Sequence, residues 1–90
     1  FRLFVIVGRE AVIRSKFSTV ICAPIYSNFT GLESEVSLSQ ADGVIKNCAI
    51  HCDELVSLPK AMLTNFVASL NTQRLRELNT ALAVALAIDP

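Results

Sequence analysis

Residues 18–28, STVICAPIYSN, restrict the fold of this chain more than any other segment. The first part of the segment is apolar and rich in β-branched residues, is too short for an isolated helix, and leads into polar residues. This pattern predicts a buried central strand that opens into a loop. Pro24 has no N–H to donate to a sheet, so we expect it where strand pairing stops or where the strand bulges. The hydroxyl pair Tyr26 and Ser27 would then lie at the rim of the sheet, where side chains can carry out chemistry.

The size and composition indicate one domain with more apolar residues than its core needs. The chain has 90 residues, enough for a single core, and 52% of them are hydrophobic. An isolated small domain would expose part of this apolar surface, so the excess predicts an oligomer face or a partner. The longest apolar segments, residues 4–7 and 81–88, are too short to cross a bilayer, and the sequence shows no secretory leader pattern. We therefore expect a cytoplasmic protein that does not associate with membranes.

The cysteines favour buried thiols over disulfides or a metal site. Cys22, Cys48 and Cys52 are an odd number and lie in apolar or strand-like sequence, which is a poor disulfide framework. Free, buried thiols in a reducing compartment are the expected state. The spacing of Cys48, His51 and Cys52 matches no zinc motif, so we expect neither a metal nor a cofactor.

Charge is unevenly distributed, although the formal net charge is zero. The start of the chain is basic, with Arg2, Arg9, Arg14 and Lys16 against Glu10. The stretch with Glu33, Glu35 and Asp42 is acidic. The basic start fits either a solvated surface or a binding site for a phosphate-bearing ligand.

Other segments predict further strands around the central one. Residues 3–7 form a strand candidate at the very start of the chain, so we expect that a first strand and loop of the domain are missing. Residues 9–17 fit a helical turn or an irregular crossover. Residues 35–38 alternate as in a half-exposed strand, and a turn is expected at residues 41–43. Residues 46–55 predict a strand with Cys48, Ile50 and Cys52 on one face and Ala49, His51 and Asp53 on the other.

Helical segments are predicted towards the end of the chain. The apolar spacing of residues 61–70, after Pro59, fits a short α- or 3₁₀-helix. Asn71 is a good N-cap for a longer helix over residues 72–88. The apolar end of that helix should be buried against the sheet or a second subunit. Strands followed by helices predict a mainly β domain over residues 1–90, a small antiparallel barrel or curled sheet with a C-terminal helix.

Five blocks of sequence carry a resemblance to a known family. They are FRLFVIVGRE, STVICAPIYSN, DGVIKNCAIHCDELVSL, PKAMLTNFVASL and NTQRLRELNTALAVAL. Their order and spacing resemble the MazF/PemK toxins of bacterial toxin–antitoxin pairs over essentially the whole chain. The family's opening strand and loop have no counterpart in this sequence.

The resemblance implies a fold, an activity and partners. The fold would be an SH3-like small barrel that forms a homodimer. The activity would be sequence-specific cleavage of single-stranded mRNA without a metal, as in an mRNA interferase. The partner would be a small MazE-like antitoxin whose extended tail folds into the RNA groove and blocks it.

The resemblance also implies catalytic residues. Members of the family place an arginine just before the first long apolar strand of this region, and Arg2 holds that position. A guanidinium is always charged and offers a planar set of donors that matches phosphate oxygens. The family's Thr or Ser at the end of the central strand aligns with Tyr26, which is a departure, and Ser27 next to it could supply the hydroxyl instead.

The remaining candidates are RNA contacts, namely Arg9, Asn28, Phe29 and His51. Phe29 could stack on bases or pack across a dimer. Imidazole is a common acid or base in catalysis, so His51 could take that role, or it could be an ordinary hydrogen-bonded strand residue. Two other kinds of function stay open. One is an inactive or gyrase-inhibitor-like binding module on the same barrel, and the other is an SH3-like adaptor.

Overall fold

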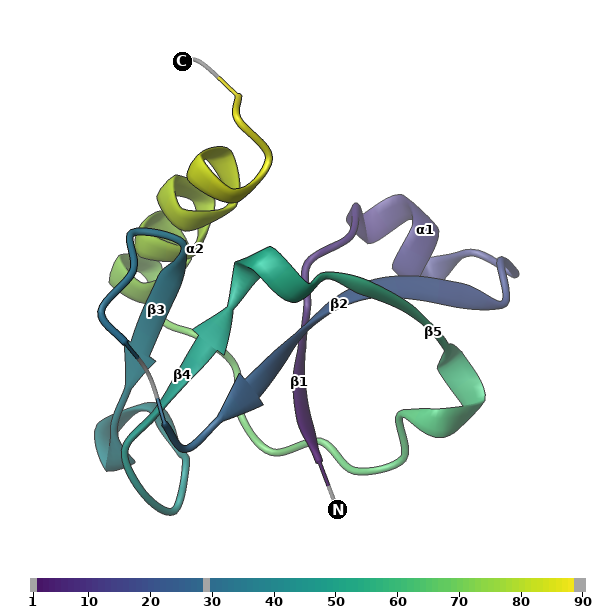
Figure 1. Ribbon diagram of the computed structural model, residues 1–90. Coiled ribbons are helices and arrows are strands. Elements are labelled where there is room, and N and C mark those ends of the chain that lie inside the picture. The colour runs from purple at the N-terminus through teal and green to yellow at the C-terminus, as the bar shows by residue number, and fades with distance from the viewer. Residues whose placement is uncertain (1, 29, 89–90) are drawn as a thin grey trace.

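The computed structural model describes residues 2–28 and 30–88. Its strands are β1 (Leu3–Ile6), β2 (Thr19–Tyr26), β3 (Glu35–Leu38), β4 (Cys48–His51) and β5 (Val56–Pro59). The α-helices are α1 (Glu10–Arg14) and α2 (Thr72–Ala85), and single 3₁₀ turns form η1 (Gln40–Asp42), η2 (Cys52–Glu54) and η3 (Lys60–Met62). Figure 1 shows a curled sheet with α2 beside β3. The predicted mainly β architecture with a C-terminal helix is confirmed.

β2 is the centre of the sheet, as the sequence predicts. All pairings are antiparallel, in the order β1-β2-β4-β3, and β5 also pairs with β2. β1 pairs along one edge of β2. Cys22 has a partner in β1 and a second partner in β5, and Ile25 has a partner in β1 and a second partner in β4, so β4 and β5 must lie on the opposite edge. The other edge is shared by β5, along residues 19–22, and β4, at Ile25 and Tyr26. One long strand therefore serves two diverging parts of the sheet, which curls the sheet into the expected SH3-like shape (Figure 1).

Pro24 lies between the two partners that share one edge of β2. Pairing stops there on that edge, as predicted, but it continues on the edge of β1, where Pro24 faces Phe4. The prediction for Pro24 is therefore correct for one edge only. A strand residue directs its backbone nitrogen towards one edge only. The nitrogen of Pro24 can face the unpaired position between β5 and β4, where its missing N–H interrupts no ladder.

β4 is shorter than the strand predicted over residues 46–55. The backbone turns into η2 at Cys52, whose N–H donates to the carbonyl of Ser34 over 3.0 Å. The Ser34 hydroxyl in turn donates to the Asp53 carboxylate. These bonds tie the start of η2 to the segment before β3, and the regular strand ends at His51.

The short helix predicted over residues 61–70 forms only at its start, as the 3₁₀ turn η3 after Pro59, and the prediction is wrong for the rest. The described residues 63–71 are irregular. Leu70 packs against the core, but Phe66 is 83% exposed and Val67 is also exposed, so most of the apolar spacing has no core to pack against. A short helix without such packing is marginal in water.

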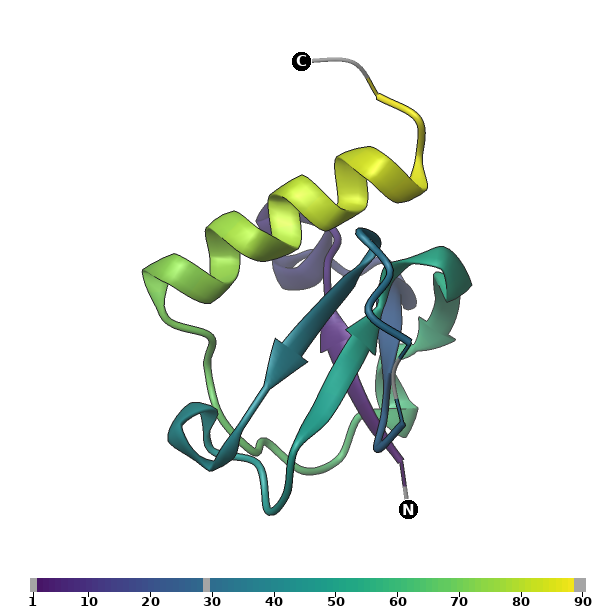
Figure 2. The same ribbon diagram turned by 60° about the vertical axis from the view of Figure 1, so that its left-hand side comes forward.

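α2 closes the core against β3 and η2 (Figure 2). The predicted N-cap is confirmed, because the Asn71 side chain accepts the Arg74 N–H over 2.8 Å. Leu78 and Ala81 are buried, but the helix ends at Ala85 and its apolar end, predicted to be covered, is exposed in this single chain at Val84, Leu86 and Ile88. None of the helices in the described residues is long and apolar enough to cross a membrane.

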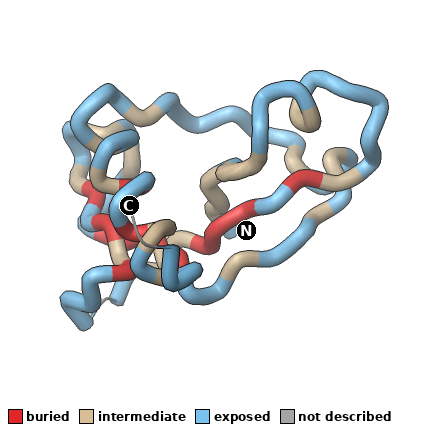
Figure 3. The backbone as a smooth tube through the Cα atoms, turned by 90° about the horizontal axis from the view of Figure 1, so that it is seen from above, coloured by how far each residue is buried: buried red, intermediate tan, exposed pale blue. Residues whose placement is uncertain are grey.

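The core lies between β2, β3, β4 and α2, and the buried stretches gather towards one side of the molecule (Figure 3). Ile50 and Cys22 are fully buried, and the three cysteines are free thiols, all buried as predicted. Burial raises the pKa of the Cys52 thiol to about 11, and the charge of Asp53 acts in the same direction. This thiol therefore stays protonated at neutral pH.

Asp42 joins α2 to the turn after β3. Its Oδ2 accepts the Ser39 N–H over 2.9 Å, and Arg74 Nε lies 3.1 Å from Oδ1 and 3.2 Å from Oδ2. The bond from Arg74, followed by the bond from Ser39, holds the pKa of Asp42 below its ordinary value of 3.8. The ionised form is therefore the one that the folded state stabilises.

We expect Asp42→Asn to lower the free energy of unfolding at neutral pH by about 1–3 kcal/mol. A depressed pKa stabilises the fold above the unfolded value, and that contribution is lost as the pH falls through the folded pKa. The gap between the variant and the natural chain should therefore narrow in acid, as measured by urea unfolding at pH 7, 5 and 3. The exposed Glu33→Gln should stay within about 0.5 kcal/mol at pH 7. An Asp42→Asn gap of equal size at every pH would contradict this assignment.

Candidate functional site

Tyr26 marks the candidate site, because β2 ends there against β4. Its cross-strand partner is Ala49, and His51 lies on the same face two residues further along β4. The rings of Tyr26 and His51 meet edge to face, with centroids 4.9 Å apart and planes at 74°. The Tyr26 hydroxyl donates to Glu54 Oε1 over 3.3 Å. The phenol is therefore held at the rim of the sheet, half-buried, by an imidazole and a carboxylate.

His51 connects this rim to the loop after β2. Its side chain is 16% exposed, and Nε2 lies 3.2 Å from the carbonyl oxygen of Asn28. Because a carbonyl only accepts, Nε2 must carry the proton of this bond. Nδ1 faces two carboxylates, with Glu35 Oε2 at 3.6 Å and Glu54 Oε2 at 3.7 Å.

Arg2 reaches the same rim from the start of β1. The antiparallel pairing places Leu3 opposite Ile25, so the residue before β1 comes next to the end of β2. The guanidinium carbon of Arg2 lies 6.0 Å from the centroid of the Tyr26 ring. This distance is the outer limit of a cation–π contact and leaves the exposed guanidinium available to an anion.

The structure brings four of the predicted site residues together, namely Arg2, Tyr26, Asn28 and His51. Ser27 follows Tyr26 and is exposed. Arg9 is exposed and precedes α1, at the opposite end of β1 from Arg2 (Figure 1). Phe29 lies outside the described residues.

Two carboxylates of the site were missed by the sequence analysis. Glu35 is the cross-strand partner of His51, and its side chain is only 6% exposed. Desolvation raises the pKa of Glu35, but bonds from Thr30 and Gly31, with the charge of His51, outweigh it and lower this pKa overall. Glu54 follows His51 by three residues, and this spacing at the end of a strand was the available signal. The contact of Glu35 depends on strand register, which the sequence did not reveal.

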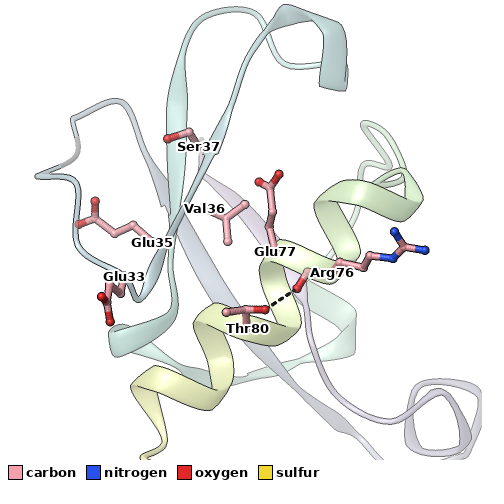
Figure 4. A pocket seen from close by; sticks show the side chains of 7 residues that line it. All are labelled: Glu33, Glu35, Val36, Ser37, Arg76, Glu77 and Thr80. Carbon is pink, nitrogen blue, oxygen red and sulfur yellow. Dashed lines mark hydrogen bonds between the residues drawn. The ribbon is translucent and has the colours of Figure 1, made fainter. Parts of the chain in front are cut away.

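A shallow groove of about 430 Å³ lies between β3 and α2 (Figure 4). It is lined by Glu33, Glu35, Val36, Ser37, Arg76, Glu77 and Thr80. Three of these side chains are carboxylates and one is a guanidinium, so the lining is negatively charged on balance and disfavours phosphate. Except for Glu35, it contains no residue of the rim, and we place the candidate chemistry at the rim.

The rim offers the groups that an anionic ligand needs. Arg2 supplies a permanent positive charge, Tyr26 a hydroxyl, and His51 an imidazole that can donate or accept hydrogen bonds. A family model described as PemK-like, MazF-like toxin of type II toxin-antitoxin systems matches residues 1–86. The chain belongs to this toxin family. The resemblance carried by the five sequence blocks is thereby confirmed.

Solved structures agree with membership of the PemK/MazF-like family. The Mycobacterium tuberculosis toxin MazF-mt6 has a TM-score of 0.91 and 26% identity, over 99% of this chain and 89% of that one. An endoribonuclease in complex with its cognate antitoxin, from a mycobacterial species, has a TM-score of 0.86 and 21% identity, over 97% and 82%. MazE-MazF from Deinococcus radiodurans has a TM-score of 0.79 and 20% identity, over 98% and 87%. At such low identity the last two show the fold alone. Comparison with curated proteins gave no match.

Proposed function

We propose that this MazF-like toxin is a metal-independent endoribonuclease that cleaves single-stranded mRNA at specific sequences. The observation that carries the proposal is the placement of Arg2 beside Tyr26, whose ring in turn contacts His51, at the rim of the sheet. These residues come from distant parts of the chain and form one polar surface next to the loop after β2. Membership of the toxin family and the likeness to MazF-mt6 support the same activity.

The reaction needs three kinds of assistance. Attack of a ribose 2′-OH on the neighbouring phosphate requires a base for its proton, positive charge near the phosphorane oxygens, and an acid for the leaving 5′-oxygen. Arg2 would stabilise the developing charge. Tyr26 or Ser27 would donate a hydrogen bond to the phosphate. The products would be a 2′,3′-cyclic phosphate and a 5′-OH.

RNA contacts would extend from the rim in two directions. His51 and Asn28 would contact nucleotides near the cut, and Phe29, which lies outside the described residues, stays a candidate from the sequence alone. Arg9 lies at the far end of β1 and would contact the RNA backbone only if the RNA ran along the sheet. Phosphate contacts of this kind give affinity without sequence preference.

We also infer two protein partners. The solved MazE-MazF complex supports a MazE-like antitoxin. A homodimer would cover the apolar residues that the end of α2 leaves exposed, such as Leu86 and Ile88. Sedimentation should then give twice the mass of the chain, and a monomer at micromolar concentration would contradict this inference.

The experiment that tests the activity is incubation of the purified protein with a long unstructured RNA in the presence of EDTA. Fragment ends are mapped by primer extension. Discrete cuts with 5′-OH ends are the expected result and would reveal the recognised sequence. Intact RNA from a folded protein would contradict the proposal.

One observation favours a second candidate, a catalytically inactive binding module. Tyr26 stands where the resemblance places Thr or Ser, and its hydroxyl already bonds to Glu54. Intact RNA together with tight binding of an antitoxin would favour this candidate.

A further inference from the structure

We propose that Glu35 is a positioning residue of the RNA site, which shapes the loop between β2 and β3 for RNA binding. The proposal rests on the ribonuclease function above and deepens it. Glu35 is nearly buried, lies on β3 at the rim, and touches both this loop and His51.

The carboxylate of Glu35 accepts three hydrogen bonds from one side of the loop. Oε1 accepts the N–H groups of Thr30, at 3.1 Å, and Gly31, at 3.0 Å. Oε2 accepts the Thr30 hydroxyl at 3.1 Å. Gly31 has φ = 77°, in the left-handed region, and a residue in this region lets successive N–H groups converge on one anion. This part of the loop is therefore built around the carboxylate.

His51 holds the other side of the same loop. Its Nε2 donates to the Asn28 carbonyl, and it faces Glu35 across the ladder of β3 and β4. The loop is thus hydrogen-bonded at two places, by His51 at Asn28 and by Glu35 at Thr30 and Gly31. Both anchors lie on paired strands, which makes them rigid compared with the exposed loop.

The direction in which the KM for RNA changes when the Glu35 carboxylate is removed separates a positioning role from a purely electrostatic one. A carboxylate near an RNA site repels phosphates, so removing it for charge alone should strengthen RNA binding. A positioning role predicts the opposite, because a loosened loop must be ordered when RNA binds. The two roles therefore move the KM for RNA in opposite directions.

Two variants of Glu35 separate its hydrogen bonds from its charge. In Glu35→Gln the amide oxygen can still accept both N–H groups, and the amide N–H₂ can donate to the Thr30 hydroxyl. Glu35→Ala removes all three bonds. Glu33→Ala is the matched control, since it removes an exposed carboxylate two residues earlier in the chain.

The experiment measures kcat and KM on an RNA oligonucleotide that carries a mapped cleavage site. We expect Glu35→Ala to raise KM by about tenfold, the size of one or two lost hydrogen bonds, with little change in kcat. Glu35→Gln should keep a KM close to that of the natural chain. Glu33→Ala should leave KM unchanged or lower it. Amide hydrogen exchange of Thr30 and Gly31 should be fast in Glu35→Ala and slow in Glu35→Gln.

Several results would overturn the proposal. One is a KM in Glu35→Ala equal to or below that of the natural chain, and another is a Glu35→Gln as impaired as Glu35→Ala. If Glu35→Ala does not fold, Thr30→Val, which removes one of the three bonds, must still raise KM by a smaller factor. An unchanged KM in that variant would overturn the proposal as well. A natural chain that cuts no RNA would instead refute the ribonuclease function, and this inference with it.

Discussion

Arg2→Ala is expected to reduce the rate of RNA cleavage by about 10²- to 10³-fold, as removal of one charge-stabilising donor does in other enzymes. The guanidinium is the permanent positive charge at the rim, 6.0 Å from the Tyr26 ring, so no neighbouring group of the rim can replace it. The loss should appear in kcat, because the charge on the phosphorane develops only in the transition state. Cleavage of a labelled oligonucleotide under single-turnover conditions measures it.

Two further variants define what the loss in Arg2→Ala means. Arg2→Lys should recover part of the rate, since a lysine keeps the charge but lacks the planar set of donors. Arg14→Ala is the matched control, because Arg14 is an exposed arginine paired with Glu10 on α1 at 2.8 Å. It should cleave at nearly the natural rate. An Arg2→Ala protein as active as Arg14→Ala would remove Arg2 from the catalytic residues.

Ile50→Ala is expected to lower the free energy of unfolding by about 2–5 kcal/mol, the usual cost of emptying a buried aliphatic site. Ile50 is 0% exposed, and its ladder partners are Ile25 on β2 and Val36 on β3. It belongs to the core cluster that also contains Leu78 of α2. Since small domains have about 5–15 kcal/mol of stability, this single change should remove a large part of it. Urea unfolding followed by circular dichroism measures the loss.

The control for Ile50→Ala is Ile45→Ala, which removes the same atoms from a side chain that is 89% exposed. It should change the free energy of unfolding by no more than about 0.5 kcal/mol. Ile50→Val should cost about 0.5–1.5 kcal/mol, because less volume is emptied. Equal losses for Ile45→Ala and Ile50→Ala would show that burial is not the cause.

Local sequence signals predicted an element correctly where the apolar face of that element is buried in the fold. The apolar run before Pro24 predicted β2, and Asn71 before a helical repeat predicted the start of α2. The same kind of signal failed for residues 61–70, where helical spacing is present but Phe66 stays in solvent. Periodicity shows which face of a segment is apolar. It does not show whether another element covers that face.

The sequence by itself determined the family, the central strand, the buried thiols, the cap of α2 and the candidate Arg2, because each depends on neighbouring residues or on a pattern shared with relatives. Only the tertiary structure decided that Glu35 faces His51 and holds Thr30 and Gly31. That contact depends on the register between β3 and β4. A shift of two residues would keep the alternation of both strands and give His51 a different partner, so the local patterns do not specify this pairing.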